Sequence, residues 1–217
     1  MADVARTLFS NTAPCKNEEC DGTGNYSQVL KNVGNHATDL DLCRHGSSGC
    51  YMSDLERADE SFSQKIGLVQ PDLIRAHKGI EVLEQLLHGK IPYPAMSQII
   101  PFRVTSAARG QVTVESEPSK KFYNTAGIVH GGFALTLLDT CMGLAVYSTL
   151  EAKLHYTTIE TKVNFVRPIT EATGLMRAIG NAIHTGTRTG TAEGRLVDHA
   201  GVIYAHGTTT CFLLNGA

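Results

Sequence analysis

Residues 122–150 are the stretch that most constrains the fold of this chain, because they are almost entirely apolar or small and contain one formally charged side chain, Asp139. Large apolar residues recur through it without leaving a polar face: Leu135, Leu137, Leu138, Cys141, Met142, Leu144 and Val146. A helix that is apolar around its circumference must be covered on all sides. The pattern predicts a buried helix over 130–148, wrapped by a sheet, with a second subunit completing the burial.

Length and charge exclude several classes of function. The chain has 217 residues, a formal net charge of −2 and a pI near 6.5. This length suits one domain with a full core, with or without an appendage. Without a global basic field, we expect no nucleic-acid partner. The apolar run 133–150 is short and interrupted by polar residues, so we expect no membrane partner. The N-terminus lacks a secretory signal, which favours a cytoplasmic location.

The six cysteines fall into two groups. Cys141 and Cys211 lie in apolar surroundings and are expected to be core residues. The other four, with two nearby histidines, could form a zinc site: Cys15, Cys20, Cys43, Cys50, His36 and His45. Their spacing lacks the short ligand pairs of structural zinc sites, so we favour free thiols and predict no metal.

Composition divides the chain into three parts. The first fifty residues are rich in Gly, Asn, Ser, Thr and Asp and have few large apolar residues, which is typical of a segment that cannot build its own core. We predict a poorly structured extension over 1–66, with Met52 as an alternative start and the preceding residues as a translated leader. Residues 67–97 should form an N-terminal helix and connector, and 98–217 the main domain.

The regular part of the sequence predicts its elements in order. Pro71 and Gly89 bracket one amphipathic helix, and β-branched residues on either side of Gly110 indicate a hairpin. After the apolar helix come four extended runs at hairpin spacing, the first ended by Pro168. In that run, four residues alternate with polar ones and predict a half-buried strand: Ile159, Thr161, Val163 and Phe165. We therefore predict an α+β fold, in which an antiparallel sheet of about six strands wraps around one long central helix, with an added N-terminal helical region.

Two features of the apolar helix can carry chemistry. A buried carboxylate such as Asp139 costs several kcal/mol unless it is hydrogen-bonded or reached by solvent, so it is either a satisfied core residue or a group that faces a cleft. The helix begins with His130-Gly131-Gly132, where unpaired N–H groups and the positive end of the helix dipole could stabilise an oxyanion. A glycine pair also permits a tight turn, so by itself it is weak support for a site.

The spacing from His130-Gly131-Gly132 to Asp139 is more specific. It is one of several matching motifs, which are Asn124, "GIVHGG", "LLD", Gly143, the strand "TTIETKVNFVRP" and the closing run "GTRTGTAEGRLVDHAGVIYAHGTTTCFLL". Through these motifs the chain resembles the PaaI-like hotdog-fold acyl-CoA thioesterases over residues 99–214. The resemblance implies the hotdog fold, no cofactor, and a homodimer or homotetramer whose active sites span the subunit interface.

Roles for individual residues follow from the same resemblance. It implies that the Gly131 amide, with a contribution from Gly132, polarises the thioester carbonyl, and that Asn124 and His130 hold the carbonyl or the attacking water. Asp139 would come from the partner subunit as general base or nucleophile. Thr158, or its neighbour Thr157, would orient water. Arg188 would contact the coenzyme A moiety, with Arg167 and Lys162 as less favoured neighbouring contacts.

The sequence therefore predicts a thioesterase that hydrolyses an acyl-CoA to a free acid and CoA. One carboxylate and one oxyanion hole suffice for this chemistry, because a thioester is already a good electrophile with a good leaving group. Two alternatives remain: a hotdog dehydratase, whose His and acid are usually placed differently, and a non-catalytic acyl-CoA-binding or regulatory hotdog module. The acyl group, the pathway and the choice between dimer and tetramer are not determined by the sequence.

Overall fold

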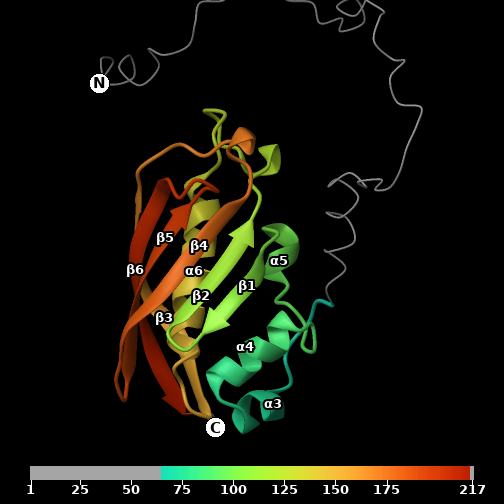
Figure 1. Cartoon of the computed structure of the whole chain (residues 1–217), viewed down its shortest axis with the longest axis vertical. Coiled ribbons are helices and arrows are strands. Elements are labelled where there is room, and N and C mark those ends of the chain that lie inside the picture. Colours follow the sequence, from blue (N-terminus) through green and yellow to red (C-terminus); the bar gives the residue numbers. More distant parts are fainter. Residues whose placement is uncertain (1–64, 216–217) are drawn as a thin grey trace, which may run out of the picture. The chain divides into compact units, whose positions relative to one another are not determined.

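The computed structural model describes residues 65–215 of the chain. It has one antiparallel sheet curved around the long helix α6, with three short helices near the β1 side of the sheet (Figure 1). This arrangement confirms the predicted α+β fold. The cysteine-rich segment, the alternative start at Met52 and the predicted extension up to residue 64 lie outside the described residues.

Two helices stand where the sequence predicts one. Helix α3 spans Pro71–Ala76 and α4 spans Gly79–Leu87, and between them His77 and Lys78 are extended, so the prediction of one continuous helix is wrong. The break has a local and a tertiary cause. The Lys78 N–H donates to the Glu81 side chain at 2.8 Å, which caps a new helix, and the Gly79 N–H donates to the Leu150 carbonyl at 3.0 Å.

The predicted hairpin is present as β1 (Arg103–Ala108) and β2 (Gln111–Ser116), with Gly110 in the turn at φ +83°. Helix α5 (Met96–Ile99) precedes it. The buried Tyr93 hydroxyl accepts a hydrogen bond from the Val104 N–H at 3.1 Å, which ties the connector between α4 and α5 to β1.

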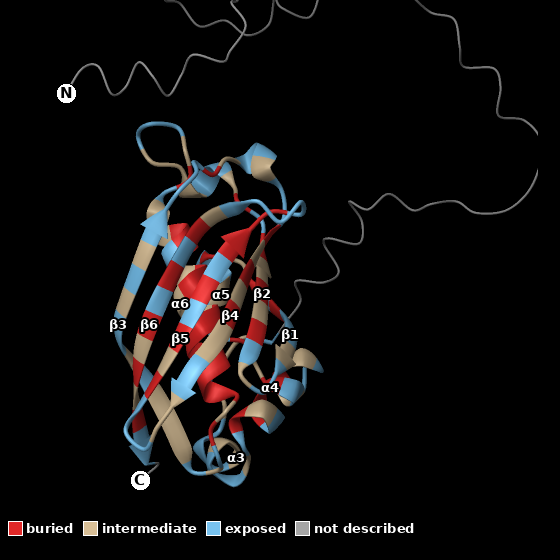
Figure 2. Ribbon diagram, turned by 60° about the vertical axis from the view of Figure 1, so that its left-hand side comes forward, coloured by how far each residue is buried: buried red, intermediate tan, exposed pale blue. Residues whose placement is uncertain are grey.

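The apolar stretch forms α6 (Gly131–Tyr147), as predicted, with His130 as N-cap and Ser148 as C-cap. Figure 2 colours most of this helix as buried. One stripe is not covered within the chain: Leu135 is 40% exposed, and Thr136, Asp139 and Thr140 are half-buried. Burial of this stripe by a second subunit remains a prediction.

Four strands complete the sheet: β3 (Leu154–Phe165), β4 (Met176–Thr185), β5 (Thr189–Val197) and β6 (Ile203–Asn215). Short 3₁₀ helices, η2 (Lys120–Phe122) and η3 (Glu171–Thr173), lie before α6 and before β4. The strand order is β1-β2-β4-β5-β6-β3, and every pairing is antiparallel. The chain therefore leaves β1 and β3 as the two edges of the sheet.

A β-bulge at Ile159 changes which side chains of β3 face α6. Thr158 pairs with Cys211 and Glu160 with Thr210, so Ile159 has no partner in the register and is 59% exposed. Because of this extra residue, Thr158 and Thr161 both lie on the inner side of the sheet, opposite the buried Cys211 and Thr209. The predicted alternation, which places Ile159 on the same face as Thr161, is therefore wrong.

Glycines on the inner face bring α6 directly onto the strand backbones. A Cβ at Gly180 in β4 would overlap the carbonyl of Cys141, and one at Gly194 in β5 would lie 2.8 Å from Cγ of Met142. Cys141, Met142 and Cys211 are fully buried, which confirms the two cysteines as core residues. This close packing fixes the height of Asp139 above the sheet.

Candidate active site

Asp139 faces a cleft of about 520 Å³ at the edge of the sheet. Three elements line the cleft: the uncovered stripe of α6, the middle of β3 and Met96 of α5. The carboxylate is half-buried, so it is neither sealed in the core nor fully solvated. The structure combines features of the two interpretations of Asp139, since the carboxylate faces a cleft and also accepts a hydrogen bond from a neighbouring hydroxyl.

A chain of threonine hydroxyls holds the carboxylate. The Thr161 hydroxyl donates to Oδ1 of Asp139 at 3.1 Å and lies 2.9 Å from the Thr209 hydroxyl, which in turn donates to the Glu160 carbonyl at 2.8 Å. Thr158 lines the same cleft. The hydrogen bond to Asp139 thus comes from Thr161, which the alternation of β3 predicts on the inner side but which was not predicted as a site residue. The bulge at Ile159 brings Thr158 to the same side.

The start of α6 presents a backbone donor. The His130 ring accepts a hydrogen bond at Nδ1 from the Gly132 N–H, at 2.9 Å, so His130 caps the helix and the Gly132 amide is engaged. Within residues 65–215 no hydrogen-bond acceptor lies at the Gly131 N–H. Gly131 is in contact with Phe165 of β3, since a Cβ at Gly131 would lie 3.0 Å from the tip of that ring. The Gly131 amide is therefore a backbone donor at this end without an acceptor among the described residues.

Asn124 shapes the loop that leads into α6. Its side-chain oxygen accepts from the Ala126 N–H at 2.9 Å and from the Ile128 N–H at 3.4 Å, and its backbone N–H donates to the Ile128 carbonyl at 2.8 Å. Gly127 in this loop has φ +76°. The carboxamide oxygen thus organises the loop, and a contact between Asn124 and a substrate stays a prediction.

Arg188 lies at the other end of α6. It is exposed in the turn between β4 and β5, with its guanidinium carbon 5.9 Å from the centre of the Phe212 ring. That turn is next to the C-terminal end of the helix, because the Thr149 and Thr185 hydroxyls are 2.8 Å apart. At 1.5 Å per residue, Gly131 and Tyr147 are separated by about 24 Å along α6.

Within one chain, the structure brings the predicted residues together in three groups. Asn124, His130, Gly131 and Gly132 gather at the start of α6, Asp139 and Thr158 line the cleft, and Arg188 stands alone at the far end. The eight residues from Gly131 to Asp139 correspond to about 12 Å along the helix. One carbonyl group cannot contact both the Gly131 amide and the Asp139 carboxylate of the same chain.

The thiols near this site are poor nucleophiles. Cys141 is buried, and desolvation raises the pKa of its thiol well above the usual value, with the nearby Asp139 charge adding to the effect. Desolvation also raises the pKa of Cys211. Residues 65–215 contain no group of three or more His, Cys, Asp or Glu side chains that could hold a metal ion. In the same residues, no helix is both long enough and apolar enough to cross a membrane.

Comparison with known sequences places the central part of the chain. Residues 126–205 match the family model described as the thioesterase superfamily. A protein of Halobacterium salinarum that is described as a candidate esterase is 32% identical over 111 residues, which cover 49% of this chain and 68% of that protein.

Solved structures share the same fold. A protein of Ralstonia eutropha, described as a candidate thioesterase related to phenylacetic acid degradation, is 25% identical with a TM-score of 0.55, covering 59% of this chain and 97% of that one. A conserved protein of Pseudomonas aeruginosa is 26% identical with a TM-score of 0.53, covering 60% and 98%. The PaaI protein of the E. coli phenylacetic acid degradation operon is 20% identical with a TM-score of 0.56, covering 64% and 97%.

Proposed function

The chain is a thioester hydrolase of the thioesterase superfamily with the hotdog fold of PaaI-like members, and from that premise we propose that it hydrolyses an acyl-CoA to a free carboxylic acid and CoA. The observation that carries the proposal is the pairing of two complementary groups on α6. Gly131 offers a backbone N–H without an acceptor among the described residues, and Asp139 offers a half-buried carboxylate in a cleft.

These groups suit the steps of thioester hydrolysis. Asp139 takes a proton from water as that water's oxygen bonds to the thioester carbon, and the carbonyl oxygen becomes an oxyanion facing the Gly131 N–H. When the C=O bond re-forms, the C–S bond breaks, and the CoA sulfur leaves with the proton that Asp139 carried. Thr161 holds the carboxylate through its 3.1 Å hydrogen bond while the proton moves.

The two groups belong to different subunits in this proposal. Strand β3 is an edge of the sheet, so a second copy can pair with it. Gly131 lies level with Phe165, and Asp139 lies level with Thr161. An antiparallel two-fold pairing centred on Val163 places Thr161 opposite the partner's Phe165, and so brings Asp139 level with the partner's Gly131.

The same two-fold pairing accounts for Arg188. It reverses one α6 relative to the other, so the C-terminal end of one helix lies at the same end of the dimer as the N-terminal end of its partner. Arg188 lies over Phe212, which alternates with the buried Cys211 and Leu213, so on the outer face of the sheet it can meet phosphates of a CoA whose thioester is at the partner subunit's Gly131. Around the thioester, Asn124 supports the loop before α6 and His130 supports the start of the helix. Thr158 lines the cleft.

The test is steady-state hydrolysis of an acyl-CoA panel by the wild type and by Asp139→Asn. Removal of the base should lower kcat by about 10²- to 10⁴-fold. Glu193→Gln, at an exposed carboxylate on β5, is the matched control and should keep the wild-type rate. A mutant rate equal to that of the wild type would refute the role of Asp139. Binding of acyl-CoA without turnover by any member of the panel would favour the non-catalytic binding module.

A further inference from the structure

A second cavity lies beside the C-terminal half of α6. It has a volume of about 480 Å³ and lies between that part of α6, the start of β3, α3, α4 and the connectors around Gly67 and Pro92. We call it the α4–α6 chamber. Its volume is within the range of about 300–1,000 Å³ typical of small-molecule pockets. The chamber belongs to the N-terminal helical region, which the proposed mechanism does not use.

The chamber is apolar. Among its lining side chains only Tyr147, His155 and Tyr156 carry polar atoms. Desolvation raises the pKa of Tyr147 to about 12, and burial, followed by the neighbouring Cys211 and Asp139, raises the pKa of Tyr156 as well. Both phenols are therefore neutral at physiological pH, and the chamber suits an uncharged hydrocarbon.

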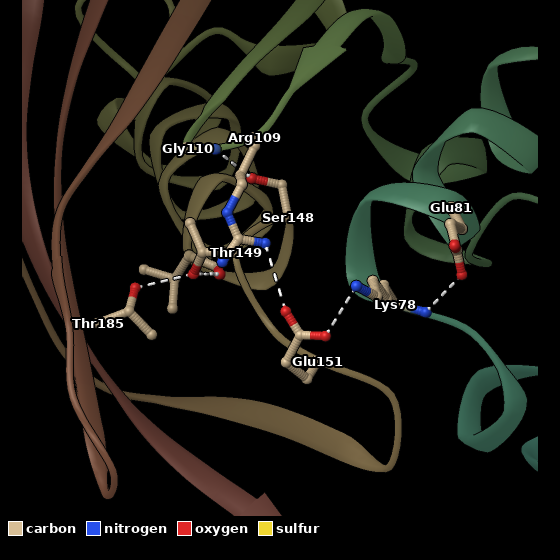
Figure 3. Close-up of polar contacts among 9 residues, drawn as sticks. Lys78, Glu81, Arg109, Gly110, Ser148, Thr149, Glu151 and Thr185 are labelled. Carbon is tan, nitrogen blue, oxygen red and sulfur yellow. Dashed lines mark hydrogen bonds and ion pairs between the residues drawn. The ribbon is translucent and has the colours of Figure 1, made fainter.

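The wall formed by α4 is fixed to the main domain (Figure 3). The Gly79 N–H donates to the Leu150 carbonyl at 3.0 Å, and Glu151 forms ion pairs with Lys78 at 3.0 Å and Arg109 at 3.7 Å. Gly79 packs so closely on the Tyr147 carbonyl that any side chain there would overlap it. The ion pairs are exposed and contribute little, so the backbone contact holds the wall.

The residues that line the chamber are next to those that line the Asp139 cleft, with the Tyr156 ring against Gly143 at the boundary between the two spaces. On α6, Thr140 lines the cleft and Leu144, one turn further on, lines the chamber. On β3, Thr158 lines the cleft and Tyr156 lines the chamber, and at the start of α5 Met96 lines the cleft and Ala95 lines the chamber. Three separate segments thus each contribute one residue to the cleft and a nearby one to the chamber.

We propose that the α4–α6 chamber receives the unbranched aliphatic acyl chain of the substrate while the thioester carbonyl stays at the Asp139 cleft. This inference rests on the proposed function and names its substrate class. From Asp139 to Tyr147 the helix advances about 12 Å. An extended hydrocarbon advances about 1.3 Å per carbon because a C–C bond is about 1.5 Å long. The chamber therefore fits a chain of roughly eight to ten carbons.

Filling the mouth of the chamber tests the proposal. Ala95 is exposed, so Ala95→Phe adds a ring at the mouth without overpacking the core. Leu144→Phe fills the chamber from α6 and serves as a second variant if Ala95→Phe does not fold. Ala200→Phe, in the exposed turn between β5 and β6, is the matched control. The substrates are straight-chain acyl-CoAs from acetyl to hexadecanoyl.

For the wild type, kcat/KM should rise by about fourfold per methylene up to roughly ten carbons. Ala95→Phe should lower kcat/KM for decanoyl-CoA by at least about tenfold and change that for butyryl-CoA by less than about twofold. A kcat/KM that does not depend on chain length, or equal losses for both substrates, would overturn the proposed role of the chamber and leave the hydrolase proposal intact. A flat profile is also the result expected if a second copy of the chain fills the chamber.

Calorimetry with non-hydrolysable thioethers separates this inference from the proposed function. The wild type should bind S-decyl-CoA at least about tenfold more tightly than S-ethyl-CoA, and Ala95→Phe should abolish that difference. If no acyl-CoA is hydrolysed, the proposed function fails. The difference in affinity between the two thioethers still tests whether the chamber binds the acyl chain. Equal affinity of the wild type for the two thioethers would overturn the inference.

Discussion

Gly131 occupies a position where the backbone N–H and the missing side chain can be tested separately. It is the first residue of α6, where proline is well tolerated, and the preceding His130 has φ −60° and ψ 138°, the extended conformation that a following proline requires. Gly131→Pro therefore removes the N–H and keeps the helix. We expect kcat to fall by about 10²- to 10³-fold, as for loss of one oxyanion-hole donor.

Gly131→Ala is the matched control for that substitution. It adds a Cβ at the same place, 3.0 Å from the Phe165 ring, but retains the N–H. The nearest atoms are at the tip of a phenyl ring, which can move by a few tenths of an ångström, so alanine should keep most of the wild-type kcat. Equal losses in the proline and alanine variants would show that space beside Phe165, and not the amide, limits the rate.

The sequence predicts some single residues of this site and not others. Asp139 and Gly131 are predicted from sequence because their signals are local: one charge in an apolar helix, and a glycine pair at its start. Their catalytic roles stay predictions. The alternation of β3 predicts Thr161 on the inner face but not its hydrogen bond to Asp139, because that contact depends on how α6 is set along the strand. Thr158 reaches the same face only through the bulge at Ile159, which is a property of the pairing between β3 and β6. Engagement of the Gly132 amide likewise depends on the rotamer of His130.

The junction between α4 and α6 is the clearest element-scale contact that depends on one residue. Gly79→Ala places a Cβ against the Tyr147 carbonyl, and backbone on both sides leaves little room for adjustment. We expect the free energy of unfolding to fall by about 1–3 kcal/mol, measured by urea denaturation. Gly67→Ala is the comparison, because its Cβ would meet Pro92 at an ordinary 3.5 Å, and its effect should be below about 0.5 kcal/mol. Equal stabilities of the two variants would argue against a rigid junction.

The sequence predicts the elements that have local signals and misses the break that a long-range contact causes. The hairpin of β1 and β2 and the helix α6 follow from local alternation, a turn glycine and an unbroken apolar run, and they form as predicted. The break between α3 and α4 does not, because the apolar spacing from Leu73 to Leu87 continues across it. Its tertiary cause is the hydrogen bond from Gly79 to Leu150, which belongs to a distant part of the chain.

At the scale of the whole molecule, the proposed site needs residues from two chains. Gly131 and Asp139 are about 12 Å apart along one helix, which is too far for both to act on a single carbonyl group. The uncovered stripe of α6 and the free edge of β3 are next to each other, since Asp139 and Thr161 join them by a hydrogen bond. A two-fold dimer through this edge would bury the stripe and complete both sites at once.

Mixed dimers of two inactive variants test this arrangement directly. Suppose that each site takes its glycine and its aspartate from different chains. In a dimer of one Asp139→Asn chain and one Gly131→Pro chain, one site then contains both substitutions and the other contains neither. Random mixing makes half of the dimers mixed, and each has one intact site, so co-expressed variants should recover about a quarter of the wild-type kcat, against a residual rate for each variant alone. If both residues act within one chain, no mixed dimer contains an intact site, and the co-expressed sample should stay at the residual rate. Differently tagged chains, purified over both tags, should raise the recovered activity to about half, because only mixed dimers remain.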